Sequence, residues 1–213
     1  MNQHFAIEIS GAPATEPVLI ADERLHLRLT TTGNGASPEV FSHPDDSLVT
    51  NLIKAAREKI ESDTGRALVT QTVKQYLDCW PGDGVIRLMR NPVQLTSPET
   101  VVITYKDADG ATQTWDTENY IVDYKSIPAR ITLEINKSFP TLRGLPNDVI
   151  IQFPAGYGAL GAVPESLIAA LNILVGTWYE NRESVAGSFG GSELKIVPMG
   201  YEALIMTYKV WDW

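Results

Sequence analysis

Cysteine is almost absent from this chain of 213 residues, which contains a single one, Cys79. One cysteine excludes an internal disulfide and any zinc site built on cysteines. Histidine is also scarce. The three histidines, His4, His26 and His43, have no nearby cysteine or acidic spacing that suggests metal ligands. The sequence therefore predicts no metal site.

Long apolar runs and an excess of positive charge are missing as well. The best candidate for a membrane span is interrupted by Asn172, Gly176 and Glu180, and a span needs about 20 apolar residues. The first ten residues lack a basic region followed by an apolar run, so we expect no signal peptide and synthesis in a cytoplasm. The chain has 17 basic and 26 acidic residues, and a net charge of −9 repels nucleic acid.

The most strongly periodic stretch predicts a helix over residues 163–184. Its apolar residues recur at spacings of four, three and four, at Leu167, Leu171, Leu174 and Trp178. Pro164 fits the first helical turn, and Glu165 adds negative charge where a helix favours it. We expect this helix to be the hub of the fold.

Three further helices are predicted on both sides of it in the sequence. Residues 21–29 fit a short helix, and residues 45–63 fit a longer one with N-capping Asp and Ser at its start. Residues 197–213 are amphipathic and end in aromatic residues. The 45–63 helix should pack on the hub helix, because neither can bury its apolar stripe alone.

Between these helices the period changes to that of β-strands. Six short runs separated by turn clusters read as strands: 69–77, 85–89, 101–105, 120–123, 131–135 and 149–153. The predicted class is α+β, a small helical bundle with a mostly antiparallel β insertion between its core helices. The expected organisation is an N-terminal segment and core helix (1–66), a β-rich insertion (67–155), and the hub helix with the C-terminal segment (156–213), the first and last forming one helical domain.

Two short motifs suggest ligand chemistry but fail on spacing. The run from Gly156 to Gly161 matches G-x-G-x-x-G, yet the helix is predicted to begin at Pro164, beyond the last glycine. Asp107 and Asp109 resemble part of a calcium loop, but the glycine after them stands at the fourth position instead of the sixth. We therefore predict no catalytic residue, no cofactor-binding residue and no cofactor; a hairpin turn explains the aspartates.

An ordered set of motifs resembles one protein family. It comprises Glu16-Pro17-Val18 with Leu25-His26-Leu27-Arg28, Ala55-Ala56-Arg57 with Thr64-Gly65-Arg66-Ala67-Leu68, Pro81-Gly82-Asp83-Gly84, Ala155-Gly156-Tyr157-Gly158, Val163-Pro164-Glu165, and Trp178-Tyr179-Glu180-Asn181-Arg182-Glu183. From about residue 16 to residue 211 the chain resembles the head–tail connector proteins of tailed double-stranded-DNA bacteriophages and prophages, also called adaptor or head-completion proteins.

The resemblance implies a structural protein of the virion and not an enzyme. Such a subunit would join the portal at the capsid vertex to a neck, stopper or tail protein and extend the DNA channel. It would form a ring with copies of itself, a dodecamer in the virion, after assembly in the host cytoplasm. DNA would pass without specific binding, and no membrane would be involved.

Aromatic residues near two helix ends are the predicted interface with the portal or a neighbouring subunit, because Trp and Tyr dominate interface energetics. The predicted residues are Tyr201, Ile205, Tyr208, Trp211, Trp213, Trp178, Tyr179 and Arg182. Two other functions stay open: a β-sandwich module that binds a carbohydrate or peptide, and, more remotely, a nucleotide-dependent enzyme that uses the glycine run.

Overall fold

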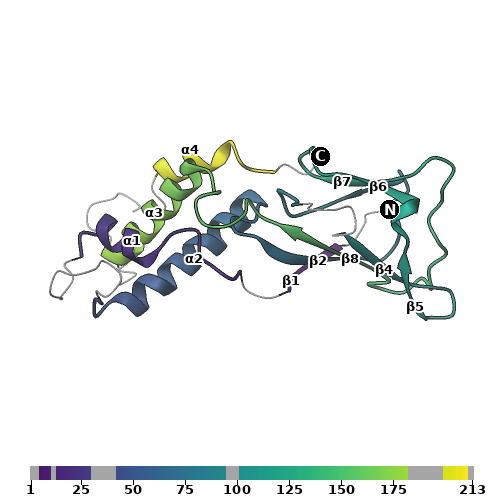
Figure 1. The fold of residues 1–213 in the computed structure, drawn as a ribbon, viewed down its shortest axis with the longest axis horizontal. Helices are drawn as coiled ribbons and strands as arrows, with labels where there is room; N and C mark the ends of the chain where they lie inside the picture. The colour runs from purple at the N-terminus through teal and green to yellow at the C-terminus, as the bar shows by residue number, and fades with distance from the viewer. Residues whose placement is uncertain (1–4, 11–12, 30–41, 95–100, 182–198, 211–213) are drawn as a thin grey trace, which may run out of the picture. The chain divides into compact units, whose positions relative to one another are not determined.

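The computed structural model describes residues 5–10, 13–29, 42–94, 101–181 and 199–210 (Figure 1). The chain divides into two compact units. The sheet unit takes its described residues from 1–14, 65–158 and 210–213, and the helical unit takes its own from 15–64 and 159–209. The first strand therefore belongs with the sheets although it precedes the helices in the sequence.

The sheet unit contains two antiparallel sheets. The larger has the strand order β1-β2-β8-β4-β5 and the smaller β3-β7-β6. Their bounds are β1 Phe5–Ile9, β2 Gln71–Leu77, β3 Val85–Arg87, β4 Val102–Lys106, β5 Thr112–Trp115, β6 Tyr120–Asp123, β7 Arg130–Leu133 and β8 Val149–Ala155, with a short 3-10 turn, η3 Thr117–Asn119, before β6. Every strand pairing within these sheets is antiparallel.

The core of the sheet unit follows from alternation along its central strands. In β2 and β8 every second side chain is buried, as a strand with one covered face requires. Val73 lies opposite Phe153, and both are fully buried. At one end an aromatic cluster completes the core, with the Trp80 ring stacked 4.7 Å from the Phe139 ring. This burial explains why the unit stays together without a disulfide.

The helical unit contains α1 Ile20–His26, α2 Asp46–Thr64, α3 Glu165–Glu180 and α4 Met199–Met206. The predicted packing of the two longest helices is confirmed, since α2 lies against α3. The two stripes that meet are fully or nearly fully buried: Val49, Ile53, Ala56 and Ile60 on α2, and Leu167, Leu171 and Leu174 on α3. Helix α4 packs on α3 and α2, and α1 packs on the same pair.

Ion pairs attach the N-terminal segment of this unit to α2. Arg24 donates from Nε and Nη2 to both carboxylate oxygens of Asp46, at 2.7 and 2.6 Å. The hydrogen bond from Arg24 is the largest cause that lowers the pKa of Asp46. Arg57 donates to Glu16 at 2.8 Å and to Glu61 at 3.1 Å. These charge-assisted bonds hold the chain before α1 and α1 itself against α2.

The α+β class is confirmed, with a helical bundle and an antiparallel β insertion. All six predicted strands exist, but β1 and β5 were not predicted, and the strands form two sheets. In the C-terminal amphipathic segment, helix α4 ends at Met206, and the described residues after it, 207–210, are not helical. No helix in the described ranges is long and apolar enough to cross a membrane.

Candidate partner-binding surfaces

Two of the predicted interface residues, Tyr201 and Ile205, lie on α4, and their own unit covers both. Tyr201 is 1% exposed, and its hydroxyl donates to Asp63 on α2 at 2.7 Å. Burial, followed by that hydrogen bond, raises the pKa of Tyr201. Ile205 is 2% exposed. In the described chain both residues hold α4 on the bundle.

The other predicted aromatic residues that the structure describes are half-buried. Trp178 and Tyr179 lie in the last turn of α3, and the Tyr179 hydroxyl donates to Asp45, which directly precedes α2. Tyr208 follows α4, and its main-chain N–H donates to Ile205 at 2.9 Å. These three side chains are therefore partly available to a partner. Arg182, Trp211 and Trp213 lie outside the described residues.

Charged residues from separate sequence motifs meet in space. The pair between Glu16 and Arg57 joins the EPV and AAR motifs across 41 positions. In the sheet unit, Arg66 of the TGRAL motif donates to the hydroxyl of Tyr157 at 2.9 Å, across 91 positions. The motifs that carry the family resemblance thus include contacts that hold each unit together.

The glycine run serves a close approach of two backbone segments. Gly156 has a φ of +140°, and a Cβ there would lie 2.5 Å from the main-chain carbonyl of Val69. The preceding strand, β8, is antiparallel to both of its neighbours, β2 and β4. A dinucleotide site needs parallel strands around this turn, so the geometry favours a structural role for the glycines.

The aspartate-rich turn is a hairpin between β4 and β5. The Asp107 carboxylate accepts hydrogen bonds from the main-chain N–H groups of Asp109 and Ala111, at 3.1 and 2.9 Å. Gly110 follows with a φ of +82°. The turn thus uses the Asp107 oxygens within the hairpin. Over the described ranges, no group of three or more His, Cys, Asp or Glu side chains is placed to hold a metal ion.

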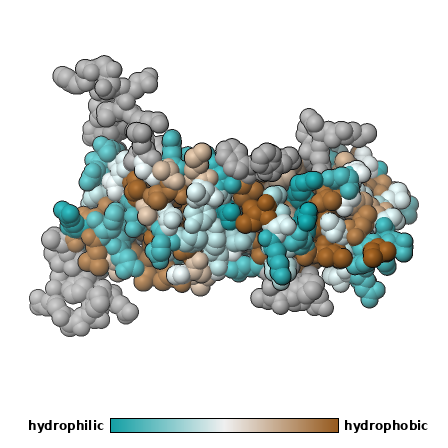
Figure 2. Space-filling model, turned by 90° about the horizontal axis from the view of Figure 1, so that it is seen from above, coloured by the Kyte–Doolittle hydropathy of each residue, from teal (hydrophilic) through white to brown (hydrophobic). Residues whose placement is uncertain are grey.

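Apolar side chains reach the surface in both units. On the face shown in Figure 2 they form several patches between hydrophilic side chains. In the sheet unit Ile121, Tyr124 and Ile127 are about half exposed around the end of β6. In the helical unit Leu19 and Leu160 are 50% and 44% exposed. Groups of this kind are candidates for contact with other chains.

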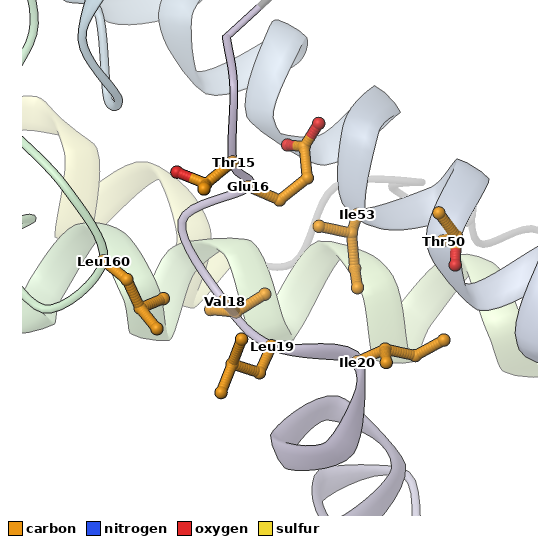
Figure 3. Close-up of a pocket in the computed structure, with 8 residues that line it drawn as sticks. All are labelled: Thr15, Glu16, Val18, Leu19, Ile20, Thr50, Ile53 and Leu160. Atoms are coloured by element: carbon orange, nitrogen blue, oxygen red, sulfur yellow. The ribbon is translucent and has the colours of Figure 1, made fainter. Parts of the chain in front are cut away.

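Leu19 and Leu160 belong to an apolar hollow of about 320 Å³ in the helical unit (Figure 3). Its walls come from the segment that leads into α1, from α2, and from the loop before α3. The lining residues are Thr15, Glu16, Val18, Leu19, Ile20, Thr50, Ile53 and Leu160. Sequence reasoning did not find this hollow, because its walls are far apart along the chain.

A second hollow of about 220 Å³ shares Val18 and Leu160 with the first. Its lining includes three carboxyl groups, those of Asp22, Glu23 and Glu165. Glu23 is 1% exposed, and burial, followed by repulsion from Asp22, raises its pKa to about 7. The sequence did not indicate that Glu23 is buried, because it occupies an ordinary position in a short amphipathic helix.

Comparison with solved structures gives likeness over nearly the whole chain. Three matches with 22–23% identity cover 97% of this chain and 96% of the other. They come from the virion of a native gene transfer agent (GTA) particle (TM-score 0.73), the neck of an empty GTA particle computed with C6 symmetry (0.72), and the neck of a native GTA particle computed with C12 symmetry (0.70). This chain has their fold.

No protein-family model matches the chain, and no curated protein sequence matches it either. At this level of identity the structural likeness establishes the fold alone. It covers both units, because the matched region leaves out only a few per cent of the residues. The helical fold of one unit and the antiparallel sheets of the other are therefore shared with chains of GTA particles.

Proposed function

We propose that this protein is a structural subunit of a phage-like particle, placed in the connector ring between the portal and the neck or tail. The observation that carries the proposal is the full-length fold likeness to chains from the necks of GTA particles. The ordered sequence motifs support it independently, since they resemble head–tail connectors. The subunit would act by assembly and not by catalysis.

The proposed ring consists of copies of this chain, twelve in the virion, stacked on the portal. C12 and C6 symmetry were used for the necks of the similar particles. Head-to-tail contacts close into a ring only when the rotation between subunits is right, and a portal can supply that rotation. We therefore expect a monomer or weak oligomer in free solution and a closed ring on the capsid.

The half-buried aromatic residues supply the proposed contacts of this ring. Trp178, Tyr179 and Tyr208 are the described candidates, together with Arg182, Trp211 and Trp213 from the sequence. Partly exposed aromatic side chains lose water on docking without the cost of refolding the subunit. Tyr201 and Ile205 would contribute by holding α4 in position.

The decisive experiment is a reconstruction of the neck of purified particles that carry this chain. Density for the chain between the portal and the next neck protein is the expected result. Its absence from the neck, with the chain found elsewhere in the particle, would refute the proposal. Particles assembled without the chain should contain portal and DNA-packed heads but leak DNA.

A truncation after Val210 tests the C-terminal contact in the same particles. Val210 itself is kept, because its Cβ lies 3.5 Å from the point where a Cβ on Gly65 would stand. The shortened protein should fold normally and fail to join heads. Unfolding of the isolated shortened chain would show instead that residues 211–213 stabilise the subunit.

A further inference from the structure

One oxygen of the buried Glu23 carboxyl group has no hydrogen-bond partner. Oε1 has no partner. Oε2 accepts from the Asn172 side-chain nitrogen at 3.2 Å in the amide orientation that satisfies Asn172, in which the same nitrogen also donates to the main-chain oxygen of Ile168 at 3.1 Å. A buried acceptor without a donor has lost its hydrogen bonds to water and gained none in return. The site is therefore incomplete in the isolated chain, and a donor from outside would stabilise it.

The carboxyl group lines the second hollow, which we call the Glu23 pocket. Asp22 and Glu165 add two exposed carboxylates to its rim. None of the described residues that line it is a lysine, arginine or histidine. Its remaining walls are mostly aliphatic, with Val18, Leu160, Val163 and Ile168 among them. Aliphatic walls beside a buried carboxyl group suit a side chain with an apolar stem and a cationic end.

We propose that the Glu23 pocket is a docking site for an arginine side chain presented by a basic segment of a neighbouring protein chain. A guanidinium group has several N–H donors, so it can pair with Oε1 and still meet the rim carboxylates. Arginine fits better than lysine because its guanidinium is more weakly hydrated and loses less on burial.

The adjoining apolar hollow extends the site. It shares Val18 and Leu160 with the Glu23 pocket, so residues that flank the inserted arginine would lie on Leu19, Ile20 and Ile53. An arginine anchor surrounded by apolar contacts is a common form of interface hot spot.

The charge of the chain favours a partner of a different kind over a second copy. The ring contacts between copies are assigned above to other residues, and a chain with 17 basic and 26 acidic residues suits a pocket lined by three carboxyl groups less well than a basic segment of another protein does. In the particle the neighbour would be a portal or neck protein. That assignment rests on the proposed function, but the chemistry of the pocket does not.

The test uses the full chain and n-propylguanidinium as the probe, with the Glu23 carboxyl carbon followed by NMR at constant ionic strength. Binding should lower the titration midpoint of Glu23 by at least about one pH unit, a tenfold change in proton affinity. It should also shift the Val18 and Val163 methyl signals with saturation. n-Propanol has the same stem without the charge and should do neither.

Glu23→Gln keeps the size of the side chain and should abolish saturable binding of the probe. Glu165→Gln removes the same charge from the exposed rim and should weaken binding only slightly. Equal binding to wild type and to Glu23→Gln would overturn the proposal, as would equal effects of n-propanol. A peptide tests the neighbour. It is taken from the portal or neck protein and contains an arginine between aliphatic residues, and it should compete with n-propylguanidinium for the pocket.

A dilution series without the probe identifies the alternative occupant. If the Glu23 midpoint changes with protein concentration, a second copy fills the pocket and our choice of partner is wrong. If n-propylguanidinium does not bind, the proposed arginine site is wrong, and the proposed function as a ring subunit is unaffected. Absence of the chain from the neck would overturn the proposed function and leave probe binding unchanged.

Discussion

At the scale of single residues, two buried polar groups of the helical unit are satisfied to different degrees. The Tyr201 hydroxyl donates to Asp63 at 2.7 Å, and Asp63 also accepts from Lys59 at 2.6 Å. Glu23 has one oxygen without a donor. Because an unsatisfied buried group costs more than a satisfied one contributes, Tyr201 should stabilise the isolated unit and an ionised Glu23 should destabilise it.

Glu23→Gln should make the stability of the protein less dependent on pH. The pKa of Glu23 is about 7 in the folded chain, against an ordinary value of 4.5. The folded state therefore binds this proton more tightly than the unfolded state does. The resulting contribution to the free energy of unfolding is lost as pH rises from 4.5 through 7. Relative to the glutamine variant, the wild type should lose up to about 3 kcal/mol over this window.

Urea unfolding at pH 4 and pH 8 measures this difference. Glu165→Gln, at an exposed position, serves as the control and should follow the wild type at both pH values. An equal loss of stability in wild type and Glu23→Gln would show that Glu23 does not titrate in this window.

Tyr201→Phe should destabilise the protein by about 1–2 kcal/mol, because it removes a buried hydrogen bond to a charged acceptor without changing the apolar volume. Thermal unfolding at neutral pH checks the value. Tyr124→Phe, at a residue 48% exposed, is the matched control and should change stability by less than about 0.5 kcal/mol. If the two variants were equally stable, the bond to Asp63 would contribute nothing net.

At the scale of elements, the turn after β8 shows why a glycine run can imitate a binding motif. Gly156 donates its N–H to the Pro92 carbonyl at 2.8 Å, and the neighbouring Tyr157 donates to the Leu68 carbonyl at 3.2 Å. The turn is held against two other backbone segments, with no room for a side chain at Gly156. Close backbone packing and phosphate binding both select glycine, so the motif alone does not separate them.

Gly156→Ala should destabilise the sheet unit by at least about 3 kcal/mol, since the new Cβ would meet backbone atoms at 2.5–2.6 Å in a conformation that L side chains rarely adopt. Gly82→Ala is the control, because nothing lies within 4 Å of the added Cβ. Hydrogen exchange of β2 and β8 amides checks the effect locally. Unchanged protection in Gly156→Ala would contradict the packing described above.

At the scale of the whole molecule, the charge of −9 bears on the proposed DNA channel. Tight non-specific binding of DNA comes from phosphate neutralisation by basic residues. A channel subunit with an acidic balance should let DNA slide without holding it.

In mobility-shift assays the isolated chain should therefore bind double-stranded DNA more weakly than about 10⁻⁴ M at physiological salt, the weak end of ordinary non-specific binding. A basic DNA-binding protein in the same assay gives the positive control. Retardation at micromolar concentrations that disappears at high salt would reveal a basic surface that net charge conceals.

Local pattern was sufficient to predict most of the elements. Apolar spacings of three and four marked α2 and α3, because a helix that packs on one face must repeat with its own turn. Alternation and turn residues marked six of the eight strands in the described ranges. Strand β1 was missed because it is stabilised by pairing with β2, about 70 residues further along the chain. Strand β5 was missed because Thr112–Trp115 is mostly polar and exposed.

Only the tertiary structure decided which side chains from different elements meet. The sequence did not indicate that the hydroxyl of Tyr201, predicted from its aromatic neighbourhood to be a partner contact, would reach Asp63, 138 positions away, and be buried there. Likewise, nothing near Glu23 in the sequence indicates that α3 and the loop before it enclose its carboxyl group. Burial of a polar side chain depends on what covers it, and the covering segments come from distant parts of the chain. The amino-acid order therefore determined the helices, the strands and the net charge, while the fold decided which polar groups are paired and which still lack a partner.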